Sequence, residues 1–163
     1  CDAEMTIAGP AGTRVVAAGD FFQGMFTTAV GAGEILTSIR FPTWPARRRY
    51  GFLEVARRQG DFALAGVAAV PDIDPNERVG AGRIAVFGAH DIAMLVDPAA
   101  AALIGSKAFA DAPAVREAAR IARATVPTRS DHHASAEYRA ELVEVLVRRA
   151  IEQALVRVDA RVA

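Results

Sequence analysis

The sequence is poor in cysteine and carries no net charge. Cys1 is the only cysteine among 163 residues, so an internal disulfide is impossible, and this chain alone cannot ligate an iron–sulfur cluster or a thiolate zinc site. Any such centre must belong to a partner. Because 19 basic side chains balance 19 acidic ones, a general role in binding polyanions is disfavoured.

Long hydrophobic runs are also missing. No apolar stretch approaches the roughly 20 residues that span a bilayer, and the N-terminus shows no basic segment followed by an apolar one, as a signal peptide would. We therefore expect a soluble, cytoplasmic protein. Since 52% of the residues are hydrophobic, a folded domain with a real core is expected. The chain opens on Cys1 rather than on methionine, so the true start is expected upstream.

The first 42 residues carry strand and turn patterns. Residues 5–16 predict a β-hairpin around the turn Gly9–Gly12, because glycine and proline there interrupt two β-leaning segments. A short helix is expected near Asp20. Residues 34–41 alternate apolar and polar side chains, which predicts a further strand.

Residues 43–49 combine a proline, a lone tryptophan and a charge run, which is typical of a boundary between domains. We therefore divide the chain into residues 1–42 and 43–163. The second part is expected to contain strands at 50–57, 63–70 and 83–87, and helices at 97–104, 111–125 and 135–158. Because strands and helices are segregated, the fold class is α+β, with a three-stranded antiparallel sheet followed by three helices.

Two details of these helices can be predicted. Asp97 is expected to be the N-cap of the first helix, with Pro98 at its first helical position. The last helix should bury an apolar stripe, since large hydrophobic side chains recur at helical spacing. The residues of this stripe are Tyr138, Leu142, Val145, Leu146, Ile151 and Leu155.

Three glycine-containing motifs are better explained by turns than by nucleotide binding. Gly31–Gly33 and Gly80–Gly82 neither follow a strand nor open a helix, so they lack the context of a dinucleotide fingerprint. Gly105–Lys107 lacks the glycine spacing of a phosphate loop. We interpret it as a helix stop.

Two further clusters offer chemistry but have simpler explanations. Adjacent residues rarely converge on one metal ion, so Asp131–His133, which precedes a helix, is expected to cap backbone donors. His90 and Asp91 are interpreted as a surface turn, because no nucleophile is placed beside them. The cluster Arg47–Arg49 leaves nucleic-acid binding as an alternative, which predicts salt-sensitive retention on DNA.

The segment Arg57–Ala63 is the most informative one. It packs two cations, a glycine, a carboxylate and an aromatic ring into one connection between strands. Such a set suits the edge of a flavin, since glycine admits a planar ligand, an aromatic ring packs on it and a cation stabilises negative charge. The residues alone also allow an ordinary β-turn with a capping Asp61.

Eight segments that follow one another along the chain are informative together. They are Gly9–Pro10, Arg14–Val16, Asp20–Gly24, Glu34–Pro42, Gly60–Ala63, Arg83–Ala85, Ser135–Arg139 and Val145–Ala150. In this order they resemble the flavoprotein (medium) subunits of molybdenum hydroxylases, the carbon monoxide dehydrogenase and xanthine dehydrogenase family, and Gly60–Ala63 is similar to that family's Gly-Asp-Tyr-Ala segment.

The resemblance implies that residues 1–42 end an FAD-binding domain and that residues 43–163 form the C-terminal domain of such a subunit, with a three-stranded antiparallel sheet and a three-helix bundle. In the family, electrons pass from a molybdopterin large subunit through the 2Fe–2S clusters of a small subunit to FAD, and then to NAD or another acceptor. The implied partners are therefore the iron–sulfur and molybdopterin subunits. The implied function is electron transfer within an FAD-dependent oxidoreductase, without a catalytic residue or a metal ligand in this chain.

By position in the motif, the resemblance implies that Arg58, Gly60, Asp61 and Phe62 line the flavin edge. Phe62 stands where the family has tyrosine, so the apolar ring is kept and the hydroxyl is lost.

The family's two glycine-rich FAD loops have no counterpart in this sequence. Those loops supply the backbone N–H groups that hold the pyrophosphate. We therefore expect that this chain alone binds FAD weakly or not at all and is inactive without the missing segment. The alternative is a non-enzymatic docking or scaffold module that has lost FAD.

Overall fold

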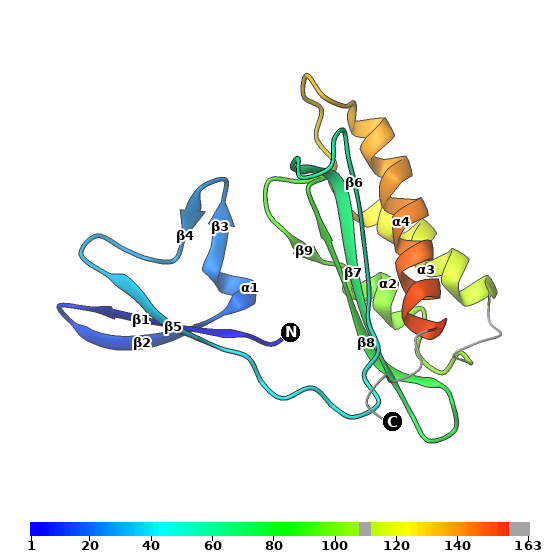
Figure 1. Ribbon diagram of the computed structural model, residues 1–163, viewed down its shortest axis with the longest axis horizontal. Helices are drawn as coiled ribbons and strands as arrows, with labels where there is room; N and C mark the ends of the chain where they lie inside the picture. Colours follow the sequence, from blue (N-terminus) through cyan, green and yellow to red (C-terminus); the bar gives the residue numbers. More distant parts are fainter. Residues whose placement is uncertain (108–111, 157–163) are drawn as a thin grey trace. The chain divides into compact units, whose positions relative to one another are not determined.

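The computed structural model describes residues 1–107 and 112–156. The chain separates into two compact units, Cys1–Trp44 and Pro45–Ala163, which are called the N-terminal and the C-terminal unit (Figure 1). Among the described residues, no helix is long and apolar enough to cross a membrane. The cytoplasmic location stays a prediction.

The N-terminal unit is built on a three-stranded antiparallel sheet. Its central strand β1 (Glu4–Gly9) pairs with β2 (Gly12–Ala17) on one side and with β5 (Ile35–Arg40) on the other. β1 and β2 form the predicted hairpin, in which Gly9 pairs with Gly12. Gly12 has a φ of +113°, a conformation that other residues adopt only at a steric cost.

Three short elements connect β2 to β5. They are α1 (Ala18–Phe21), β3 (Phe22–Gly24) and β4 (Thr27–Thr28). The helix expected near Asp20 is therefore present as a single turn. Phe21 packs with Met5 and Ile7 of β1 in a small buried core.

The C-terminal unit contains an antiparallel sheet in the order β6-β7-β8-β9. The three predicted strands correspond to β6 (Gly51–Ala56), β7 (Ala63–Ile73) and β8 (Val79–Phe87), and a two-residue strand β9 (Met94–Leu95) extends the sheet. The prediction of a turn at Gly80–Gly82 was wrong. These residues lie inside β8, which pairs with β7 as far as Val79.

Three helices follow the sheet and cover one of its faces, as Figure 1 shows for α2 (Asp97–Ala101), α3 (Ala112–Thr125) and α4 (Ala136–Val156). The predicted α+β class is thus confirmed. The N-cap prediction for α2 was wrong, because Val96 occupies the cap position, no side chain bonds the free N–H groups there, and Asp97 is already helical. The ends predicted at residues 111 and 158 lie outside the described residues.

The buried stripe of α4 differs from the predicted one. Tyr138 and Val145 are 46% and 38% exposed, so their assignment to the core was wrong. Leu146, Ile151 and Leu155 are buried as expected, and small side chains complete the contact with the sheet. The remaining buried residues of the helix are Arg139, Val143, Val147, Ala150 and Ala154.

Strand β6 and helix α4 approach each other very closely. A Cβ atom placed on Gly51 would lie 1.9 Å from the carbonyl oxygen of Ala150. Gly51 thus lets a strand and a helix pack backbone to backbone. The main core lies between the sheet and the helices and includes Val67, Val86 and Val147.

Candidate functional site

The connection between β6 and β7 is a tight turn that Asp61 stabilises. The backbone N–H of Asp61 donates to the carbonyl oxygen of Arg58 at 3.1 Å, and Oδ1 of Asp61 accepts a hydrogen bond from the N–H of Phe62 at 3.0 Å. Oδ2 of Asp61 lies 3.3 Å from Nη2 of Arg57. Gly60 has a φ of +82°, which explains glycine at this position.

This turn presents an aromatic ring and a cation to its surroundings. Phe62 is 94% exposed, and Arg58 is exposed as well. No atom lies within 4 Å of the position that a Cβ on Gly60 would take, so the space above the glycine is open. An exposed ring, an open glycine and a cation fit the edge of a planar, partly anionic ligand.

A second aromatic feature lies on the sheet face opposite to the helices. Phe52 of β6 and Phe87 of β8 stack with ring centroids 5.4 Å apart and planes inclined by 20°. The ring of Phe87 lies over Gly66 of β7, because a Cβ there would come within 2.2 Å of Phe87 Cζ. This pair was not predicted from the sequence, although alternation along β6 places Phe52 opposite to the core residues Leu53 and Val55.

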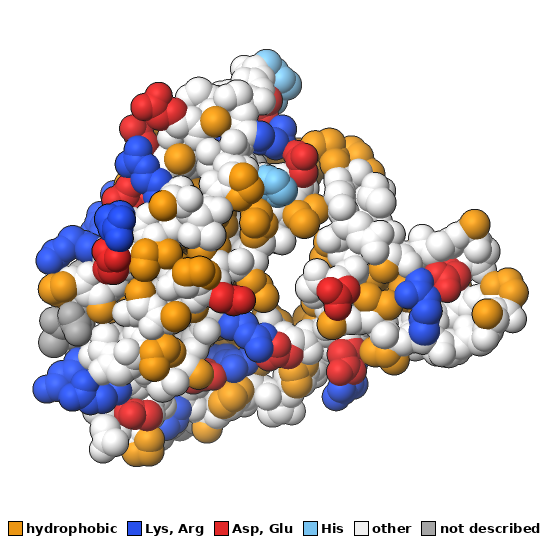
Figure 2. All heavy atoms as spheres, turned by 180° about the vertical axis from the view of Figure 1, so that it is seen from behind, with side chains coloured by type: hydrophobic (Ala, Val, Ile, Leu, Met, Phe, Trp, Pro, Cys, Tyr) orange, Lys and Arg blue, Asp and Glu red, His pale blue; other side chains and the backbone are white. Residues whose placement is uncertain are grey.

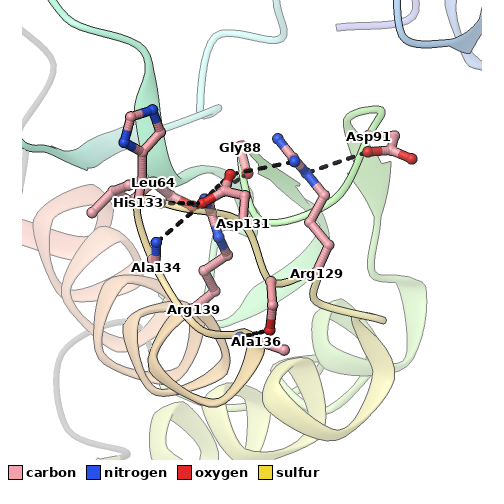
Figure 3. A network of polar contacts seen from close by, with 10 residues as sticks. Leu64, Gly88, Asp91, Arg129, Asp131, His133, Ala134, Ala136 and Arg139 are labelled. Atoms are coloured by element: carbon pink, nitrogen blue, oxygen red, sulfur yellow. Dashed lines mark hydrogen bonds and ion pairs between the residues drawn. The ribbon is translucent and has the colours of Figure 1, made fainter.

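A buried arginine connects the base of the turn with two other loops (Figure 3). Arg139 of α4 is 2% exposed. Its Nη1 donates to the carbonyl oxygens of Leu64 and Gly88, and its Nη2 donates to Oδ2 of Asp131 at 2.6 Å. Figure 3 shows the Asp131 carboxylate beside the Arg139 guanidinium. The network therefore joins the start of β7, the end of β8 and the loop before α4.

Asp131 anchors that loop, as the capping interpretation predicted. Its Oδ1 accepts hydrogen bonds from the backbone N–H groups of His133 and Ala134 at 2.8 and 3.0 Å, while Arg129 lies 3.3 Å from Oδ2. The bond from the His133 N–H, together with Arg139, holds the pKa of Asp131 well below its usual range. Among residues 1–107 and 112–156, no group of three or more potential ligand side chains could hold a metal ion.

His133 lies within electrostatic reach of the turn. Partial removal from water lowers the pKa of its imidazole, and the positive charges of Arg57 and His132 lower that pKa further. The His132 and His133 rings have centroids 3.6 Å apart. His90 and Asp91 do form a surface bend, and Asp91 lies 3.2 Å from Arg129.

The basic cluster Arg47–Arg49 is engaged within the C-terminal unit. Arg48 forms two hydrogen bonds with the carboxylate of Asp72, at 2.6 and 2.8 Å. Arg47 pairs with Glu77 at 2.7 Å, and Arg49 donates to the carbonyl oxygen of Leu155 at 2.7 Å. Figure 2 shows Arg and Lys side chains interspersed with Asp and Glu over the face that it draws. These contacts explain the cluster without a nucleic acid.

Two protein-family models match the chain, one over each of its two parts. Residues 50–154, more than half of it, match the model of the CO dehydrogenase flavoprotein C-terminal domain. The chain belongs to this family. Residues 1–44 match the FAD binding domain in molybdopterin dehydrogenase. The resemblance to CO dehydrogenase flavoprotein subunits, which the ordered motifs indicated, is therefore confirmed.

Curated relatives agree with this placement. The chain is 35% identical over 151 residues to the carbon monoxide dehydrogenase medium chain of Afipia carboxidovorans, which covers 93% of this chain and 51% of the relative. It is 40% identical over 144 residues to the nicotine 6-hydroxylase medium subunit of Paenarthrobacter nicotinovorans, covering 88% and 49%. The chain thus spans about half the length of the curated relatives that it matches.

Solved structures show the same fold. Reconstituted CO dehydrogenase from Oligotropha carboxidovorans matches with a TM-score of 0.88 and 33% identity, over 96% of this chain and 54% of that one. Quinoline 2-oxidoreductase from Pseudomonas putida 86 matches with a TM-score of 0.86 and 35% identity, over 94% and 52%. The flavoprotein fold predicted from the motifs is confirmed.

Proposed function

We propose that the chain is the flavin-facing part of the FAD-bearing subunit of a molybdenum hydroxylase, and that the turn Arg57–Phe62 lines the edge of the flavin. The observation that carries this proposal is the turn itself, in which Phe62 is 94% exposed beside an open Gly60. Support comes from the consecutive matches to an FAD binding domain and to a flavoprotein C-terminal domain.

Four residues of the turn have distinct roles in this proposal. Phe62 packs its ring on the flavin, because aromatic faces stack with planar ligands. Gly60 leaves room for close approach, and the cation of Arg58 stabilises negative charge at the ring. Asp61 lies at the same edge of the flavin. It closes the turn through its bonds to Arg57 and Phe62.

FAD, when bound, accepts and releases the electrons of the complex. In the proposed assembly these come from the 2Fe–2S clusters of a small subunit, which take them from a molybdopterin large subunit, and they leave to NAD or another acceptor. The exposed ring of Phe62, the open Gly60 and the cation of Arg58 support a flavin ring as the ligand of the turn. The pyrophosphate is expected to be held by glycine-rich loops outside residues 1–163, so the chain by itself should bind FAD weakly.

The test uses the full-length FAD-bearing subunit that contains this chain. Phe62→Ala and Asp61→Ala are compared with wild type by FAD affinity, flavin absorption spectrum and rate of acceptor reduction. Ile104→Ala is the matched control, since Ile104 is 50% exposed and directly precedes Gly105, whose N–H donates to the carbonyl oxygen of Val79 at the end of β8 far from the turn.

We expect both turn variants to shift the flavin absorption bands and to weaken FAD binding, while Ile104→Ala behaves like wild type. Unchanged spectra and kinetics in both turn variants would contradict the site assignment. A full-length subunit that stays colourless when FAD is supplied would instead favour a scaffold module that has lost its cofactor.

A further inference from the structure

We propose that Arg139 is a positioning residue for the turn Arg57–Phe62: it binds the base of that turn, the end of β8 and the loop before α4, and so fixes where Phe62 is presented. The inference rests on the proposed function only where it concerns the flavin. The positioning of the turn can be tested without any cofactor.

The burial of Arg139 needs an explanation. Among the described residues it is the only charged side chain that is buried, and its Nε has no hydrogen-bond partner. A buried charge is expensive to desolvate, and a well-packed apolar side chain is often as stable in its place. Stability alone therefore does not account for an arginine here.

The geometry of its hydrogen bonds accounts for an arginine at this position. The carbonyl oxygen of Leu64, two residues after Phe62, accepts a hydrogen bond from Nη1 of Arg139. The same nitrogen donates to the carbonyl oxygen of Gly88 at 3.0 Å. A planar guanidinium offers several donors in one fixed fork, so it can set the separation of two backbone segments in a way that lysine cannot.

The two segments are also in close contact next to the turn. A Cβ on Gly88 would lie 2.6 Å from the carbonyl oxygen of Ala63, and Gly88 has a φ of +76°. The loop after β8 can therefore pack directly against the first residue of β7. Arg139 holds this approach from the inside of the unit.

Asp131 supplies the third connection. Its Oδ2 binds Nη2 of Arg139, while its Oδ1 holds the backbone of His133 and Ala134. A shift of the guanidinium would therefore move the loop that contains His133 and Ala134 together with the turn. The three loops form one rigid block around a single buried side chain.

The experiment measures hydrogen–deuterium exchange in the full-length subunit, with and without FAD. Arg139→Met keeps the length of the side chain and removes its donors, and Arg139→Lys keeps the charge without the fork. Arg148→Met is the matched control on the same helix, where Arg148 forms an exposed ion pair with Glu152.

We expect Arg139→Met to raise exchange at residues 61–65, 88–91 and 131–135 by about tenfold or more, because buried hydrogen bonds that restrain local opening are lost. Arg139→Lys should restore part of the protection, and Arg148→Met should leave it unchanged. In the FAD-bound subunit, Arg139→Met should also shift the flavin spectrum. If Arg139→Met fails to fold, Arg139→Lys must by itself show an increase in exchange, smaller than about tenfold, that is confined to the same three segments.

Unchanged exchange in the three segments would overturn the proposal, as would a uniform increase across all helices, which indicates a merely structural role. The two proposals fail separately. If exchange rises locally while neither Arg139→Met nor Phe62→Ala alters the flavin, Arg139 positions the turn but the turn does not face FAD. If Phe62→Ala alters the flavin and Arg139→Met changes nothing, the positioning role is refuted.

Discussion

Gly51→Ala should destabilise the C-terminal unit strongly, because β6 and α4 meet there backbone to backbone. The added Cβ would lie 1.9 Å from the Ala150 carbonyl oxygen and 2.8 Å from its carbon. Both atoms belong to the helix backbone, so no side chain can rotate away. Strand and helix must separate by about 1 Å, in an interior packed at crystal-like density.

Overpacking of this kind costs about 1–3 kcal/mol, and replacing a strand glycine by alanine returns about 0.5–1 kcal/mol of chain entropy. Because the clash is with backbone, we expect a net loss of about 2 kcal/mol in the free energy of unfolding. For a unit of this size that lowers the melting temperature by on the order of 5–10 °C.

The assay is thermal unfolding followed by circular dichroism at the helix band, since the long helices belong to the C-terminal unit. Gly80→Ala is the control: Gly80 lies in β8, and its added Cβ would come no closer than 3.6 Å to Asp74 Cβ. We expect this variant to melt within about 2 °C of wild type. Equal melting temperatures for the two variants would refute the strand–helix contact.

Two further predictions concern ion pairs. Hydrogen bonds from the Arg14 side chain and from the backbone N–H of Gly31 lower the pKa of Glu34 to about 2. This is below the pKa of about 4.3 in the unfolded chain. The Glu34 contacts therefore stabilise the fold fully above about pH 4.3, and this stabilisation is lost as the pH falls through about 2. A carboxyl titration by NMR should show it, and an ordinary pKa would contradict the contact. Arg48→Met should destabilise the C-terminal unit by about 1–3 kcal/mol in urea unfolding, since it leaves Asp72 without its two charge-assisted bonds. Wild type should show no salt-sensitive retention on DNA, and such retention would reopen the nucleic-acid alternative.

Most of the strands and helices could be predicted from patterns among residues that are close together in the sequence. Short apolar-rich runs predicted β6 and β7, and the glycine–proline turn predicted the hairpin of β1 and β2, because these signals depend on near neighbours. Gly80–Gly82 was misassigned since strand pairing with β7 overrides the low strand preference of glycine. The ends of helices are harder to predict, because they depend on capping residues. In α2 the cap position is held by Val96, whose side chain forms no capping hydrogen bond.

The candidate site was only partly predictable. The turn Arg57–Phe62 could be found because all its residues are consecutive. Arg139 could not, since its partners Leu64 and Gly88 lie 75 and 51 residues away, and a charged residue is normally expected outside the core. One signal was available: Arg139 precedes Val143 by four positions and so continues the buried stripe of α4.

The central claim, that Phe62 faces the flavin, is tested most directly by placing a quencher at that position. In the full-length FAD-bearing subunit, Phe62→Trp would bring an indole against the flavin ring, where electron transfer from the indole quenches flavin fluorescence at short range. Ile104→Trp serves as the distant control. Flavin emission is expected to fall sharply in Phe62→Trp and to stay at the wild-type level in Ile104→Trp. Equal emission in both variants and wild type would contradict it.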